Sequence, residues 1–156
     1  MSVSIAHPPL PRVFRRRLKA NRAWRRWTAA WVGGSVLGIA NGVIRELVYK
    51  DRIGELRANQ IAVAVLVALL ALYFSILERR WPIPTLREAI AIGATWTILT
   101  VVFEFVFGHW VDGKTWSELF QNYNVADGRL WLLALIWIGA GPAVIRRRRR
   151  SIGGTR

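Results

Sequence analysis

The uninterrupted apolar stretch ANQIAVAVLVALLALYFSIL, residues 58–77, decides the fold of this 156-residue chain. It contains 20 residues without a charge, between Arg57 and Glu78. A helix rises about 1.5 Å per residue, so the stretch reaches about 30 Å, the thickness of the hydrocarbon core of a bilayer. Backbone polar groups in hydrocarbon must pair within their own segment. The stretch is therefore predicted to be a membrane-spanning helix.

Three further apolar runs, at residues 27–44, 89–107 and 130–145, predict three more spans. Thr85 and Glu88 form a capping-box pattern that opens the third span. A chain of this length could not cover four such helices with polar surface, which disfavours a soluble protein. The sequence thus predicts an all-α integral membrane protein, a four-helix bundle.

The loop between the third and fourth spans carries a helical pattern of its own. Thr115 and Glu118 form a second capping box. Apolar residues follow at helical spacing and predict a short amphipathic helix on the outer surface: Trp116, Leu119, Phe120 and Tyr123. We expect Asn124 to end this helix and Asp127 to cap the fourth span.

The net charge of +14 is confined to the two ends of the chain. Residues 1–26 contain eight basic residues, residues 146–156 contain six, and neither segment contains an acid. Residues 27–145 hold nine basic and nine acidic residues. With both ends on one side of the membrane, that side carries 17 basic residues and the two loops opposite carry 4. The positive-inside rule then predicts a basic cytoplasmic leader (1–26), a transmembrane domain (27–145) and a basic cytoplasmic tail (146–156).

The basic ends suggest contact with anionic lipid head groups at the cytoplasmic face of the inner membrane. The residues expected to make it are Arg15, Arg16, Arg17, Arg25, Arg26, Arg146, Arg147 and Arg148. The alternative is that these residues act only as a topology signal. A nucleic-acid partner is not expected, because no aromatic residues are interleaved with the tail arginines.

Gly34, Gly38 and Gly42 recur every fourth residue along the first span. Such a ridge of small residues lets another helix approach closely. The ridge predicts a packing seam within one chain or, alternatively, a contact between chains in a homo-oligomer.

Polar residues near the spans gather at the predicted outer end. They are Asn41, Arg45, Glu46, Glu104, His109 and Arg129. A charge in hydrocarbon costs about 2.5–3.5 kcal/mol on insertion scales, so each one needs a reason. Helix length places Glu104 and Arg45 at similar depth, which predicts an ion pair between them, with Arg129 as the competing partner. The cluster either locks the helices together or forms a small site for an ion, a proton or an anionic ligand.

Other kinds of site find no support in the sequence. The chain has no Cys and two His, too few for a histidine metal site, so no metal is expected. It contains no glycine-rich phosphate loop, no nucleophilic serine elbow and no HExxH pattern. We therefore expect no cofactor and no catalytic residue.

Two segments resemble an uncharacterised family of small four-span bacterial inner-membrane proteins. They are Asn41-Gly42-Val43-Ile44-Arg45-Glu46, and a second segment made of Phe103-Glu104-Phe105, Gly108-His109, Trp116-Ser117-Glu118-Leu119, Tyr123-Asn124 and Gly128-Arg129-Leu130-Trp131. The resemblance covers about residues 28–145. It implies a bacterial inner-membrane protein and brings no activity or ligand with it.

Three functions remain open from the sequence. The first is a structural or accessory membrane component without enzymatic activity. The second is a small transporter or channel subunit that uses Glu104 and Arg45. The third, and the weakest, is a membrane enzyme acting on lipid head groups.

Overall fold

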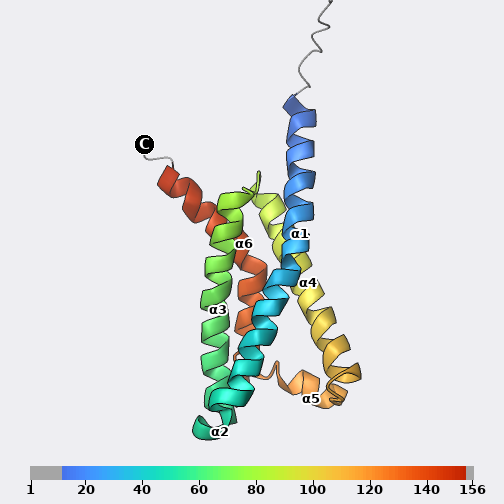
Figure 1. Cartoon of the computed structure of the whole chain (residues 1–156). Helices are drawn as coiled ribbons and strands as arrows, with labels where there is room; N and C mark the ends of the chain where they lie inside the picture. The colour runs from blue at the N-terminus through green and yellow to red at the C-terminus, as the bar shows by residue number, and fades with distance from the viewer. Residues whose placement is uncertain (1–11, 154–156) are drawn as a thin grey trace, which may run out of the picture.

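The computed structural model describes the backbone of residues 12–153 and the side chains of residues 20–151 (Figure 1). Its regular structure is entirely helical over this range. The elements in chain order are α1 (Arg12–Ile44), the π-helix η1 (Arg45–Tyr49), α2 (Lys50–Ile53), α3 (Glu55–Arg80), α4 (Leu86–Trp110), α5 (Trp116–Gln121), the 3-10 helix η2 (Val125–Asp127) and α6 (Trp131–Gly153).

Three stretches of the described chain are long and apolar enough to cross a membrane: Ala20–Ile53, Glu55–Arg80 and Leu86–Trp110. The sequence predicts four spans. Helix α6, which contains the predicted fourth span, is not among the three. Its uncharged part covers residues 131–145, and five consecutive arginines follow. The all-helical class is confirmed, and the structure shows three membrane-length apolar helices.

Helix α1 joins two segments that the sequence separates. It runs without a break from Arg12 to Ile44, so basic residues 12–26 and the first apolar run form one helix. The expected leader residues 1–11 and tail residues 154–156 lie outside the described residues. The side chains of Arg15, Arg16 and Arg17 lie outside the described side chains as well.

Helix α6 packs against two of the three membrane-length helices. It contacts both α3 and α4, and α1 packs against these same two helices (Figure 1). The backbones of α4 and α6 approach closely at two glycines, because a Cβ placed on Gly93 would lie 1.9 Å from the carbonyl oxygen of Gly139. Small residues at a helix crossing permit this close packing.

The two ends of the helix packing differ. We call the end with the α3–α4 turn and the C-terminal part of α6 the terminal end, and the end with α2 and α5 the loop end (Figure 1). Three buried aromatic rings, Trp27, Phe74 and Trp96, fill the interior toward the terminal end and are here called the aromatic plug. Their ring centroids lie 5.1–6.3 Å apart.

Two indole N–H groups fix the aromatic plug to the backbone. Trp27 donates its indole N–H to the Trp81 carbonyl at 3.0 Å, and Trp96 donates to the Trp27 carbonyl at 2.9 Å. The indole N–H of a buried tryptophan usually finds such a partner. The plug therefore connects α1, α3 and α4 near the terminal end.

Polar side chains close the terminal end around the α3–α4 turn. Buried Glu78 accepts a hydrogen bond from the Ile83 backbone N–H at 3.0 Å. Buried Arg146, on α6, donates to the carbonyls of Ile83 at 3.0 Å and Pro84 at 2.8 Å. Arg149 donates to the Glu78 carbonyl in addition. We call these contacts the arginine lock, since they fasten α6 to the turn.

Substitution of Gly93 tests the close approach of α4 and α6. In Gly93→Ala the new methyl group meets the Gly139 carbonyl, so we expect a loss of about 1–3 kcal/mol of stability, typical of overpacking. Thermal unfolding of the detergent-purified protein measures it. Gly38→Ala is the matched control, because a Cβ there has no atom within 4 Å. Equal unfolding temperatures for both variants would contradict the packing.

Candidate functional site: a cavity at the loop end

A cavity of about 930 Å³ lies among α1, α3, α4, α5 and α6. Its floor is apolar and aromatic and includes Trp31, Leu66, Leu70, Trp96 and Ile138. Its mouth is charged and includes the exposed residues Glu46, Glu55, Asp112, Lys114 and Glu118. The volume is at the upper end of the ~300–1,000 Å³ range of small-molecule sites.

The glycine ridge of α1 forms part of the cavity wall. A Cβ on Gly34 would lie 2.7 Å from the Trp96 ring, so this glycine packs within the chain. A Cβ on Gly38 or Gly42 would have no atom within 4 Å, and both residues line the cavity. Two of the three predicted seam glycines thus leave space empty, and a contact between chains remains a prediction.

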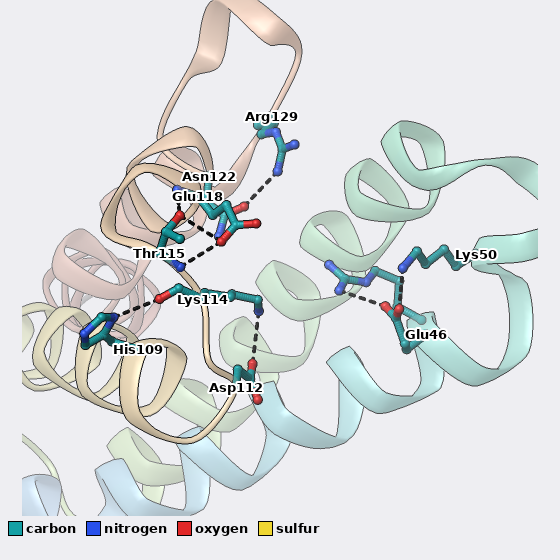
Figure 2. Close-up of polar contacts among 10 residues, drawn as sticks. Glu46, Lys50, His109, Asp112, Lys114, Thr115, Glu118, Asn122 and Arg129 are labelled. Atoms are coloured by element: carbon teal, nitrogen blue, oxygen red, sulfur yellow. Dashed lines mark hydrogen bonds and ion pairs between the residues drawn. The ribbon is translucent and has the colours of Figure 1, made fainter.

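On the α1 side, the predicted site residues hold the cavity wall in place. Asn41 is buried and donates from Nδ2 to the Ala62 carbonyl at 2.9 Å, which ties α1 to α3. Arg45 and Glu46 lie on the π-helix η1 and pair at 3.2 Å. Lys50 pairs with the same Glu46 carboxylate (Figure 2). The Arg45 Nε atom is buried and has no hydrogen-bond partner.

On the opposite side, Glu104 is held by two neutral donors. Its Oε2 atom accepts hydrogen bonds from the Tyr123 hydroxyl at 2.6 Å and from the Trp131 indole N–H at 2.7 Å. None of the ion pairs of the described side chains includes Glu104. The predicted pair between Glu104 and Arg45 is therefore wrong. The turn after α5 places Tyr123 against the carboxylate, and Arg45 is paired with its own neighbour.

Tyr123 remains a hydrogen-bond donor over a wide pH range. Burial, together with the hydrogen bond to Glu104, raises the pKa of this phenol above its ordinary value. The hydroxyl therefore stays protonated and continues to donate to the carboxylate.

The last two predicted site residues stabilise the loop. Arg129 donates to Asn122 Oδ1 at 2.8 Å (Figure 2). It also lies 3.8 Å from the Glu55 carboxylate. His109 donates its Nδ1–H to the Lys114 carbonyl at 2.8 Å. Its ring stacks on Trp116 with centroids 4.2 Å apart. Arg129 lines the cavity, whereas His109 does not.

Helix α5 begins as the sequence predicts. Both hydrogen bonds of the capping box at Thr115 and Glu118 are present, as they are at Thr85 and Glu88 for α4. The bonds from Thr115 hold the pKa of Glu118 below its usual range. Buried Leu119 anchors the helix.

The end of the loop differs from the prediction. Helix α5 ends at Gln121, and Asn124 instead caps the 3-10 helix η2 by accepting from the Ala126 N–H at 3.1 Å. Asp127 lies inside η2 and accepts from the Asn124 side chain at 2.7 Å, so it does not cap α6. Asn and Asp side chains can cap either of two successive turns, so their spacing in the sequence does not decide which turn they cap.

Sequence reasoning missed three residues of this site. Lys50 shares the Glu46 carboxylate, and Tyr123 and Trp131 hold Glu104. The helical spacing of Tyr123 and the border position of Trp131 mark both as ordered. Neither feature indicates a carboxylate partner.

The arrangement suits an organic ligand with both polar and apolar parts. Two buried polar atoms, Arg45 Nε and Asn59 Oδ1, have no hydrogen-bond partner, and both residues line the cavity. The described residues contain no group of three or more His, Cys, Asp or Glu that could hold a metal ion. Buried polar atoms without partners are rare and mark places where a ligand or water can bind.

Comparison with protein-family models, with curated proteins and with solved structures finds no match to the chain.

Replacing the hydroxyl that binds Glu104 tests the Glu104 side of the cavity. Tyr123→Phe leaves a half-buried carboxylate with one donor fewer, which we expect to cost about 1–3 kcal/mol. Thermal unfolding gives the loss, and hydrogen exchange should rise in residues 116–128. Tyr49→Phe is the control, because the Tyr49 hydroxyl has no hydrogen bond among the described residues. Unchanged exchange in Tyr123→Phe would show that the bond does not order the loop.

Proposed function

We propose that this chain is a four-span inner-membrane protein of accessory type that binds a small ligand in the loop-end cavity. Both termini are cytoplasmic in this proposal, and α5 lies on the outer side. The basic residues of the two ends and of the α3–α4 turn support the orientation. Helix α6 supports a fourth span, because it packs between two helices of membrane length.

The observation that carries the proposal is a cavity with a polar mouth at the loop end and a floor closed by the aromatic plug. The mouth lies among loop-end residues, and the aromatic plug fills the interior beneath it. Trp27 and Phe74 are 0% exposed and Trp96 is 2% exposed. A ligand entering from the loop end meets these rings before it reaches the terminal end. This geometry favours binding over conduction.

Transport is the second candidate. Glu104 and Arg45 both line the cavity, and a carboxylate without a cation is a feature of proton and ion pathways. Transport would require the aromatic plug to open. It predicts ion or proton flux in liposomes that Glu104→Gln abolishes. An enzyme acting on lipid head groups is the weakest of the three functions, because the cavity shows no activated nucleophile.

Single cysteines test the topology, because the chain has no natural cysteine. A membrane-impermeant maleimide should label Ser117→Cys and Arg52→Cys in intact spheroplasts. It should label Arg80→Cys and Ser151→Cys only after lysis. All four positions are exposed. Labelling of Ser151→Cys in intact spheroplasts would show that α6 does not return the chain to the cytoplasm.

Filling the cavity tests ligand binding. Gly38→Leu adds a side chain to the cavity wall at a position where a Cβ meets no atom within 4 Å, so the fold should persist and the ligand should be lost. Native mass spectrometry of protein purified in mild detergent should show a bound mass in the wild type that is absent in Gly38→Leu. Ala40→Leu adds the same side chain at an exposed position outside the cavity and should keep the bound mass. The same bound mass in all three proteins would refute the proposal.

A further inference from the structure

The loop-end cavity is open sideways as well as at its charged mouth. Its lining includes Ile39 and Val43 on α1 and Phe107 on α4, which are 47%, 49% and 38% exposed. Helices α1 and α4 diverge toward the loop end (Figure 1). In a bilayer, these exposed apolar side chains face hydrocarbon. A ligand can therefore enter from the lipid, between α1 and α4.

The interior of the cavity matches an apolar chain. Trp31, Leu66, Leu70 and Ile138 form its floor, and Gly38 leaves the adjoining wall of α1 bare. The charged mouth lies at the opposite end. A lipid of the outer leaflet has the same polarity, with its head group at the surface and its chain directed inward.

The charged residues of the cavity favour a head group that carries both a positive and a negative charge. Arg45 on η1 and Lys50 at the start of α2 share the carboxylate of Glu46, which is the one ion-pair partner that either cation has among the described residues. The Arg45 Nε–H has no hydrogen-bond partner, and Arg45 lines the cavity. On α4, Glu104 receives two neutral hydrogen bonds and no cation. An anionic group would supply the missing hydrogen-bond acceptor at Arg45, and a cationic N–H donor would supply the missing countercharge at Glu104.

We propose that the cavity binds a zwitterionic lipid whose head group joins a phosphate to a primary ammonium, with an acyl chain against the aromatic floor. The phosphate pairs with Arg45, and the ammonium donates to Glu104. This inference rests on the proposed function, since it names the ligand of the same cavity. An anionic glycerol head group brings no cation to Glu104. A choline head group brings a cation without an N–H donor.

The test uses native mass spectrometry of the full chain in mild detergent. Phosphatidylethanolamine, phosphatidylcholine and phosphatidylglycerol with identical acyl chains are added in equal amounts. We expect the ethanolamine lipid to be retained about tenfold over the choline lipid, the size of one charge-assisted hydrogen bond. Stepwise N-methylation of the ethanolamine should lower retention progressively. Free phosphoethanolamine, which lacks a chain, should not bind.

Three variants locate the binding. Glu104→Gln should abolish the preference for ethanolamine over choline while a lipid still binds. Arg45→Gln should weaken all three phospholipids. Arg52→Gln, at an exposed position of α2 outside the cavity, is the control and should behave as the wild type. The N-methylation series gives the same answer on the wild type if a variant fails to fold.

The outcomes separate this inference from the proposal on which it rests. Equal retention of the three lipids by the wild type, with loss of all three in Gly38→Leu, overturns the head-group assignment and leaves the cavity as a binding site. Preference for phosphatidylglycerol overturns the assignment in the same way. Retention that Gly38→Leu does not change overturns both.

Discussion

The close approach of α4 and α6 at Gly93 and Gly139 is the constraint on which the remaining packing depends. Lipid is as apolar as the helix surfaces, so helices in a membrane are held by van der Waals contact and hydrogen bonds. Two glycines let the backbones touch, and this contact holds α6 beside α4, where it also packs on α3. The position of α6 then brings Arg146 within reach of the Ile83 and Pro84 carbonyls.

Helix α1 lacks a comparable backbone contact, and the cavity follows from that. It is fastened near the terminal end by Trp27 of the aromatic plug and near the loop end by the side chain of Asn41. Between and beyond these points, Gly38 and Gly42 meet no neighbour. Glycine thus has two different effects in this molecule. At Gly93 it permits a tight helix crossing, and on α1 it leaves the cavity wall open.

The sequence predicts the long helices and the two capping boxes well because both depend on local features. Uninterrupted apolar runs and the two Thr–x–x–Glu boxes locate α3, α4 and α5 closely. The partners of Glu104 depend instead on how the turn after α5 folds back, which no spacing rule states. The arginine lock uses backbone carbonyls as acceptors, and a carbonyl leaves no mark in the sequence. The cavity is space left by the path of α1, so no residue pattern indicates it.

The arginine lock also accounts for the charge that directly follows the apolar part of α6. On the proposed topology, the carbonyls of the α3–α4 turn lie near the cytoplasmic boundary of the membrane, where those without a partner are costly. Arg146 satisfies two of them while only 6% exposed, so this charge sits against protein and not against lipid. Arg147 and Arg148 are exposed and remain available to anionic head groups. On that topology, the basic tail orients the chain and also closes the fold, because its first arginine is held by carbonyls of the protein.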